Sequence, residues 1–256
     1  MNSYKLILSY RGSAFSGFQT QPNTSTVESE ILKALDKVLQ GKVFNFSYAG
    51  RTDSGVHAMG QVVGFHSPFF LSAQNMVRAL NSVLHHDIFI SDAYHVNSAF
   101  HARYSALSRR YDYFFSDQNI PLFYKDRIAE FNQTLDVSAF HIIRSSMMGC
   151  HDFFAFTKHH ALQKCCQREI FKFELKKNLL QDIYNSDEII YYYQFSIVAN
   201  GFLYNMVRNI VGAMVSVFSG QNSVDSFSKY KLTGNRNRFK FIMAKSSGLY
   251  LTKVNY

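Results

Sequence analysis

The sequence predicts a mixed α/β fold of the α+β type, in which two ferredoxin-like β-α-β-β-α-β halves have joined, mostly antiparallel sheets, helices on one side and a central cleft. Two observations predict it. Short strands and amphipathic helices follow one another in the same order twice, and no low-complexity segment or proline-rich linker interrupts them. With 256 residues, of which 47% are hydrophobic, the chain has ample material for a buried core.

The first half, residues 1–104, contains the first of these two series. Alternating apolar residues over 4–10 predict a strand. Over 25–39 apolar residues recur at helical spacing, and Ser25 with Glu28 predicts a capping box at the helix start. The other elements expected in this half are strands near 43–48, 59–66 and 87–94 and a helix over 72–84.

The second half, residues 105–256, repeats that order without obvious sequence identity. A cleft between the halves would be lined by strand ends and loops, and the linking stretch VNSAFHARYSALSRRY would run close to it. The elements expected here are a strand over 109–115, a helix near 135–149, strands near 168–177 and 189–198, a helix over 202–218 and a last strand in GLYLTKVNY.

The net charge is +9, and most of the excess lies in the last fifth of the chain. Basic segments with interleaved Phe and Tyr suit a polyanion whose bases can stack, so RNA or single-stranded nucleic acid is the expected partner. The alternative is a surface that is merely basic. Against Asp225 alone, residues 201–256 contain the cations Arg208, Lys229, Lys231, Arg236, Arg238, Lys240, Lys245 and Lys253.

The chain is expected in the cytosol. No run approaches the roughly 18 uncharged apolar residues of a membrane span. The start, MNSYKLILSYRGSAF, has too short an apolar stretch for a signal peptide and no small-residue cleavage site. Three cysteines form no disulfide framework in a chain of this size, which fits a reducing compartment.

Neither a metal nor a cofactor is expected. Cysteines and histidines gather within residues 150–166, but adjacent cysteines seldom ligate one ion together, and no C-x-x-C pair occurs. The chain also lacks the G-x-x-x-x-G-K phosphate loop and the dinucleotide fingerprint. The members of the group are Cys150, His151, His159, His160, Cys165 and Cys166.

The stretch YAGRTDSGVHAMGQVVGF, residues 48–65, contains one carboxylate, that of Asp53, and no other Asp or Glu occurs between residues 36 and 87. Gly50 and Gly55 predict a tight loop around it. The aspartate could cap its own loop as an Asx turn or act in catalysis, and the pattern alone favours neither. Two-metal sites and ordinary glycosidases need clustered carboxylates, and this stretch supplies only one.

Three neighbours of this aspartate have their own alternatives. Arg51 could pair with Asp53 and keep it ionised, hold a phosphate with its planar fork, or be solvated. Asp53, Ser54 and His57 supply the residue types of a hydrolase triad. Three side chains within five consecutive residues rarely reach the relay geometry, so a triad is disfavoured.

Two residues of the second half are further candidates. Strand alternation places Tyr111 and Tyr113 on one face, where a tyrosine either stacks on a flipped base or packs in the core. Arg208 lies near the start of an otherwise uncharged helix, where it gains nothing from the helix dipole. It belongs to a polar and small-residue stripe that either meets a partner or faces solvent, formed by Asn205, Arg208, Asn209, Gly212 and Ser216.

The motif GRTDSGVHAMGQVVGF resembles the signature loop of the tRNA pseudouridine synthase A family, G-R-T-D-x-G-V-H-A-x-x-Q-V. FHARYSALSRRYDY, DFFAF, FLYNMVRNIVG and GLYL are similar to further family segments in the expected order, so the resemblance spans essentially the whole chain. It implies a homodimeric, cofactor-independent isomerase that converts uridine to pseudouridine at positions 38–40 of the tRNA anticodon stem-loop. By motif position, Asp53 is the nucleophile, Arg51 and Arg208 are cleft arginines, and Tyr111 binds the target base.

The chain departs from the family pattern at three places. Arg11 stands where members usually have Asp, Phe18 where they usually have Trp, and the proline often found before the last motif is missing. These differences bear on tRNA contact and loop stiffness rather than on the reaction class. The residues alone leave a second function open, a non-catalytic RNA-binding protein that uses the same basic cleft.

Overall fold

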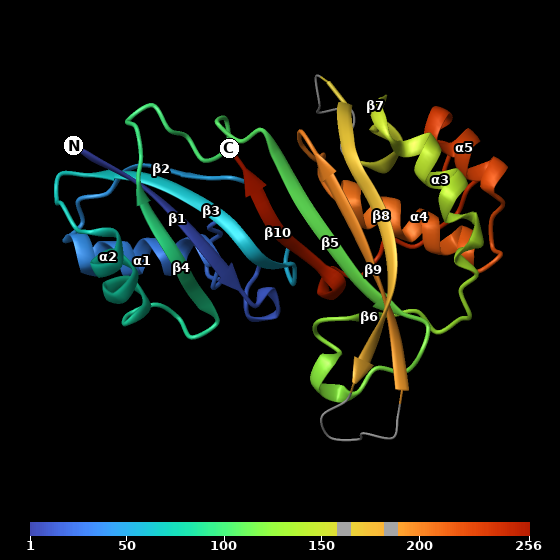
Figure 1. Ribbon diagram of the computed structural model, residues 1–256, viewed down its shortest axis with the longest axis horizontal. Helices are drawn as coiled ribbons and strands as arrows, with labels where there is room; N and C mark the ends of the chain where they lie inside the picture. Colours follow the sequence, from blue (N-terminus) through green and yellow to red (C-terminus); the bar gives the residue numbers. More distant parts are fainter. Residues whose placement is uncertain (158–164, 182–188) are drawn as a thin grey trace. The chain divides into compact units, whose positions relative to one another are not determined.

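The computed structural model describes residues 1–157, 165–181 and 189–256, which form two compact units. Unit 1 comprises Met1–Arg109 with Tyr250–Tyr256, and unit 2 comprises Arg110–Leu249. Both units combine helices with mostly antiparallel strands (Figure 1), which confirms the predicted fold class. Within the described ranges, no helix has the length and apolar character needed to cross a membrane.

The central strand of unit 1 is β3. One of its edges pairs antiparallel with β1, which pairs in turn with β4. Its other edge pairs antiparallel with β2 and, near its start, in parallel with β10, where Tyr250 lies opposite His57. The order β1-α1-β2-β3-α2-β4 is that of the predicted ferredoxin-like half. These elements are β1 (Asn2–Tyr10), α1 (Val27–Leu39), β2 (Phe44–Tyr48), β3 (His57–Ser67), α2 (Ala73–Asn81), β4 (Ile88–His95) and β10 (Leu249–Asn255).

The capping box of α1 lies one residue further on than predicted. Thr26 is the N-cap: its hydroxyl accepts a hydrogen bond from the Ser29 N–H at 3.3 Å, and the Ser29 hydroxyl accepts one from the Thr26 N–H at 3.2 Å. The predicted box of Ser25 with Glu28 is therefore wrong. The Glu28 carboxylate instead accepts from the Thr20 N–H at 2.7 Å, which ties the preceding loop to the helix.

Both faces of the unit 1 sheet are covered. Helices α1 and α2 lie side by side on one face (Figure 1), where alternate residues of β1, such as Leu6 and Leu8, are fully buried. On the other face Val62 of β3 packs against Ala49 and Ala102, the second of which comes from the segment after β4. Because β3 is enclosed in this way, the loop that enters it has a rigid base.

Among its described residues, unit 2 contains strands β5 to β9 and the helices α3, α4 and α5, which gather together in Figure 1. Strands β8 and β9 form a long antiparallel pair, and β7 extends it antiparallel along the other edge of β8. The short strand β6 pairs in parallel with the end of β5. The elements are β5 (Ser108–Ser116), β6 (Ala129–Glu130), α3 (Phe140–Met147), β7 (Gly149–Asp152), β8 (Gln167–Gln181), β9 (Ile189–Ala199), α4 (Met206–Phe218) and α5 (Val224–Thr233).

The last strand belongs to a different unit than the division of the chain at residue 104 suggested. Through its parallel pairing with β3, β10 joins residues 250–256 to unit 1, which also includes residues 105–109. The Leu107 N–H donates to the Asn255 carbonyl at 2.8 Å, and the Tyr256 hydroxyl donates to the Ala102 carbonyl at 2.7 Å. The end of the chain therefore packs with the half that carries Asp53.

The polar stripe of α4 is buried rather than solvated. Asn209 has no exposed surface, and Ser216 is 3% exposed. A Cβ at Gly212 would lie only 2.2 Å from the Ile242 carbonyl oxygen, so segment 241–244 runs directly over this face. Arg208 stays partly exposed. The solvated alternative for the stripe is therefore wrong, and glycine at 212 is needed for the close approach of the covering segment.

Candidate active site

Asp53 lies, half-buried, in the loop between β2 and β3. A tight turn forms this loop, in which the Val56 N–H donates to the Asp53 carbonyl oxygen at 3.1 Å. Gly55 has φ +78°, a backbone conformation that favours glycine, as the sequence suggested. The Gln61 side-chain amide donates to the Gly50 carbonyl at 2.8 Å and fixes the other end of the loop.

A buried network of side chains supports the residue before Asp53. The Tyr10 hydroxyl lies 2.8 Å from the Thr52 hydroxyl, and the Gln61 amide donates to Tyr10 at 3.4 Å. Burial raises the pKa of Tyr10 far above its ordinary value, so this phenol keeps its proton and can donate it to Thr52. The network holds Thr52, which is 7% exposed, and with it the backbone of the catalytic candidate.

The segment after β1 supports the loop from behind. The Phe18 N–H donates to the Thr52 carbonyl at 3.0 Å. Gly17 has φ +100°, and a Cβ there would lie 3.2 Å from both the Thr52 carbonyl oxygen and the Ser54 nitrogen. The Phe18 ring is fully buried, 4.7 Å from the Tyr48 ring. Phe18, one of the departures from the family pattern, is thus part of the loop's support.

The positions of His57 and Ser54 in the structure disfavour a hydrolase triad. His57 is 3% exposed, and its Nδ1 accepts a hydrogen bond from the Gly12 N–H at 3.1 Å. Its ring stacks on Tyr250 with centroids 4.6 Å apart. The Ser54 hydroxyl donates to the Phe15 carbonyl at 3.4 Å. Since His57 is packed into the fold and Ser54 bonds to the backbone of another segment, neither has the setting of a triad.

Arg51 is exposed, and its Nε donates to the Tyr48 hydroxyl at 3.0 Å. The guanidinium has further N–H donors beyond the one bonded to Tyr48. This setting leaves Arg51 able to meet an anionic ligand from solvent, such as an RNA phosphate.

In unit 2, Tyr111 is 9% exposed, and its ring packs edge-on against Phe202 with centroids 5.0 Å apart. Tyr113, two residues along β5, is fully buried, and its hydroxyl donates to the Lys245 carbonyl at 2.9 Å. Both follow the predicted strand alternation. The core alternative applies to Tyr113, whereas Tyr111 keeps a small exposed surface beside another aromatic ring.

The guanidinium of Arg208 is held by the segment that covers α4. Its Nε donates to the Ala244 carbonyl at 2.8 Å, and the Ala244 N–H donates to the Arg208 carbonyl at 3.2 Å. Burial raises the pKa of Tyr113, and the nearby charge of Arg208 opposes that rise. Beside it, the buried Oδ1 of Asn205 has no hydrogen-bond partner among the residues described. Arg208 is thus positioned by backbone contacts on both of its ends.

Sequence reasoning did not identify one buried acid of unit 2, Asp112. It is 2% exposed, and its Oδ1 accepts from the Arg110 guanidinium at 2.9 Å and from the Gln194 amide at 3.2 Å. The Ser196 hydroxyl also donates to it. An acid that receives this many donors inside a sheet is part of the packing, so it is a poor nucleophile.

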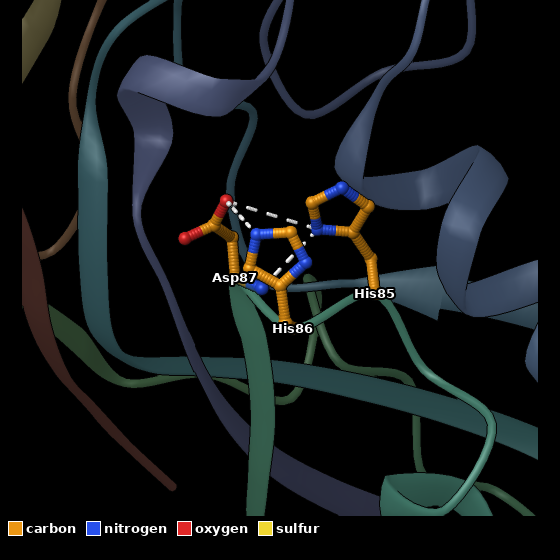
Figure 2. A group of neighbouring side chains, drawn as sticks. All are labelled: His85, His86 and Asp87. Atoms are coloured by element: carbon orange, nitrogen blue, oxygen red, sulfur yellow. Dashed lines mark hydrogen bonds and ion pairs between the residues drawn. The ribbon is translucent and has the colours of Figure 1, made fainter.

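A group of possible metal ligands lies just before β4, where His85, His86 and Asp87 face one another (Figure 2). The Asp87 carboxylate is already paired with Arg11, whose Nε lies 2.8 Å from it. The Asp87 N–H donates to Nδ1 of His85 at 3.2 Å. Because a cation and a backbone donor occupy these atoms, the group suits an ion pair better than a metal. In the cysteine and histidine group, His159 and His160 lie outside the described residues.

Comparison with known proteins identifies the family. The model of the tRNA pseudouridine synthase family matches residues 6–105 and 144–256. The chain belongs to this family. Similar relatives include tRNA pseudouridine synthase A of Listeria monocytogenes serotype 4a (strain HCC23), 35% identical over 100% of both chains, and tRNA pseudouridine synthase A 1 of Bacillus cereus (strain ATCC 14579), 37% identical over 100% of this chain and 99% of its own. A third is tRNA pseudouridine synthase A of Lacticaseibacillus casei (strain BL23), 34% identical over 100% of both chains.

Family membership makes this protein an isomerase that forms pseudouridine in tRNA. It therefore decides between the two functions that the residues alone left open, in favour of the enzyme. The residues that support the loop from inside the fold, Tyr10, Thr52 and Gln61, were not singled out from the sequence. Thr52 and Gln61 stand within the quoted motif, so their polar side chains beside buried positions were the available signal.

Proposed function

We propose that this protein isomerises uridine at positions 38–40 of the tRNA anticodon stem-loop, with Asp53 as nucleophile and without a cofactor. The observation that carries the proposal is the rigid mounting of Asp53: main-chain bonds fix the turn, and the network of Tyr10, Thr52 and Gln61 fixes it from inside. A nucleophile must be placed to within fractions of an ångström to contribute fully to catalysis.

The reaction needs one placed carboxylate because it rearranges a single glycosidic bond. The bond from ribose C1′ to uracil N1 breaks, the base rotates, and a bond from C1′ to C5 forms. The hydrogen on C5 leaves as a proton, and N1 gains a proton, so atoms and electrons balance without water or a cofactor. Asp53 can attack C1′, add to C6 of the ring, or stabilise a glycal route, and each of these uses the ionised carboxylate.

The other three candidates have roles that follow from their settings. Arg51 extends an exposed guanidinium beside the Asp53 loop, which suits a phosphate of the RNA backbone. Tyr111 offers a ring edge and hydroxyl supported by Phe202, which suits a base that has left the helix stack. Arg208, held at its Nε by Ala244, carries a positioned positive charge, which suits stabilising negative charge at the reacting centre.

The proposal includes the setting of the enzyme. We expect a homodimer that binds the anticodon stem-loop of tRNA and works in the cytoplasm, where its tRNA substrates are. The excess of basic residues in 201–256 supports a contact with the RNA backbone. Sedimentation of the purified protein, alone and with tRNA, measures the stoichiometry. A protein mass twice that of one chain supports the dimer, and a monomer that retains full activity contradicts it.

Tritium release tests the activity and its position together. Four transcripts of one tRNA are made with tritium at uridine C5: three keep a single uridine at position 38, 39 or 40, and the fourth has none there. The proposal predicts release from at least one of the three and background release from the fourth. Equal release from all four would place the target elsewhere in the tRNA, and binding without any release would indicate the non-catalytic alternative.

A further inference from the structure

Unit 2 has a cavity of about 530 Å³ that none of the residues proposed for catalysis lines. It lies between the start of α4, the end of α5 and the segments 154–157 and 236–243. Aromatic rings form much of its wall, contributed by Phe154, Tyr230 and Phe241. A volume of this size is typical of small-molecule and cofactor sites, and it has room for one nucleotide.

The polar part of the wall is organised around Arg236. The guanidinium stacks over the Phe241 ring, with its carbon 3.7 Å from the ring centroid. One nitrogen donates to Asn209 Oδ1 at 3.0 Å and another to the Phe241 carbonyl at 3.3 Å. Asn209 is itself fixed, since its amide donates to the Phe156 carbonyl at 2.9 Å. An arginine held in this way presents its remaining donors in a fixed direction.

The wall also contains a polar group without a partner. Thr157 is 7% exposed, and its hydroxyl oxygen has no hydrogen-bond partner among the residues that the structure describes. Burying a hydroxyl unpaired is unfavourable, so such groups call for an explanation, and a ligand or a bound water is the common one. Since Thr157 lines the cavity, a ligand in the cavity can supply the missing bond.

The lining selects the class of ligand. Among the described residues, no Asp or Glu lines the cavity, so the site does not suit a cation. Aromatic faces, a stacked guanidinium and a free hydroxyl together suit a nucleobase, which stacks on rings and accepts hydrogen bonds at its edge. An exposed cation follows closely in the sequence, at Lys240, and suits a phosphate next to that base.

We propose that this cavity binds one unpaired nucleotide of the tRNA, other than the uridine that is isomerised, and so acts as a second recognition site. The inference rests on the proposed function in that it takes tRNA as the bound RNA. Ala244, the residue after the cavity-lining Met243, accepts the Arg208 hydrogen bond. Occupation of the cavity therefore also steadies the segment that positions Arg208.

Matched substitutions test the cavity through binding rather than activity. The dissociation constant for an unmodified tRNA transcript is measured at one salt concentration for Arg236→Ala, Thr157→Val and the control Arg238→Ala, which removes the same charge two residues away, outside the cavity. We expect Arg236→Ala to weaken binding about 10-fold and Thr157→Val about 3-fold. The control should change it less than Arg236→Ala. Arg236→Lys, which keeps the charge but loses the planar fork, should resemble Arg236→Ala.

Several outcomes would overturn the proposal. Equal effects of Arg236→Ala and Arg238→Ala would show that only net charge matters. Unchanged tRNA binding by Thr157→Val would show that its hydroxyl meets water only. Calorimetric titration with UMP and with AMP tests whether the ligand is instead a free nucleotide. If Arg236→Ala abolishes the binding of these nucleotides while tRNA binding is unchanged, the cavity is assigned to a free nucleotide.

Failure of the catalytic proposal would look different. In that case the wild-type protein would release no tritium from any transcript, whatever the binding constants of the four variants. Thermal midpoints within a few degrees of the wild type confirm that each variant is folded. Thr157→Val gives a particularly clean comparison because valine matches threonine in shape and removes a buried polar group.

Discussion

At Thr52, the residue before Asp53, a buried hydrogen-bond network holds one short loop in place. Thr52 bonds through its hydroxyl to Tyr10 and through its carbonyl to the Phe18 N–H. These contacts come from β1 and from the segment that follows it, so distant parts of unit 1 determine where the loop lies. The position of Asp53 therefore depends on residues that are distant in the sequence.

Thr52→Val tests this dependence. The substitution keeps the shape but removes the bond to the buried Tyr10 hydroxyl, so we expect the free energy of unfolding to fall by about 1–2 kcal/mol. We also expect slower tritium release with little change in tRNA affinity. Urea denaturation and single-turnover kinetics measure the two effects. Thr20→Val is the matched control at an exposed position, and identical behaviour of the two variants would refute the role of the network.

At the scale of elements, α4 and the segment that covers it position Arg208. Gly212 sits where the two approach closely, with Ile242 opposite. In an exposed helix, replacing glycine by alanine stabilises by roughly 0.5–1 kcal/mol because the unfolded chain loses freedom. Here the added methyl group has no room, which reverses the sign.

Gly212→Ala should therefore destabilise unit 2 by about 1–3 kcal/mol. Because the covering segment carries the Ala244 carbonyl that holds Arg208, tritium release should slow as well. Denaturation curves and the release rate provide the measurements. Ser145→Ala, an exposed site in α3, serves as a helix control with no expected loss, and a stabilised Gly212→Ala would contradict the packing account.

The sequence predicted most elements and the candidate loop, but it misplaced features that depend on contacts between distant segments. Periodicity identified α1, α2, β1 and β4 because each buries one face in a regular pattern. The attachment of β10 to β3 leaves no local pattern, so residues 250–256 were assigned to the other half. The stripe on α4 looked like a polar surface because nothing in the pattern of the helix itself shows that 241–244 covers it.

The candidate loop could be predicted because its residues lie close together in the sequence. Asp53, Arg51 and Gly55 lie in one short motif, so the loop and its glycine could be recognised without knowing the fold. The supporting contact of Tyr10 with Thr52 joins residues 42 positions apart, so it could not be recognised from the sequence. The capping box shifted by one residue because Ser25, Thr26 and Ser29 offer several caps, and local sequence alone does not rank them.

For the whole molecule, buried tyrosines make stability depend on pH at the alkaline end. Burial raises the pKa of both Tyr10 and Tyr113 far above their ordinary value of about 10. Below pH 10 these phenols are protonated in the folded and unfolded states, so their contribution to the free energy of unfolding is fully present. Above it they ionise in the unfolded chain first, which favours unfolding.

The free energy of unfolding should thus fall above about pH 10, by up to about 1.4 kcal/mol per pH unit for each of the two tyrosines. Urea denaturation between pH 9 and 11.5 measures the slope. Tyr113→Phe should make the fall shallower. Tyr104→Phe, at a site that is 77% exposed, should leave it unchanged. A flat profile across this range would show that the two phenols ionise equally in both states.

The central claim is that Asp53 performs the chemistry, and the most direct measurement is tritium release by Asp53→Asn beside binding of the same tRNA. The account predicts that release falls at least about 1,000-fold, while the dissociation constant stays within a few-fold of the wild type. Asp92→Asn, an exposed aspartate on β4, should behave as the wild type in both assays. Retention of more than a tenth of the wild-type rate by Asp53→Asn would contradict the account.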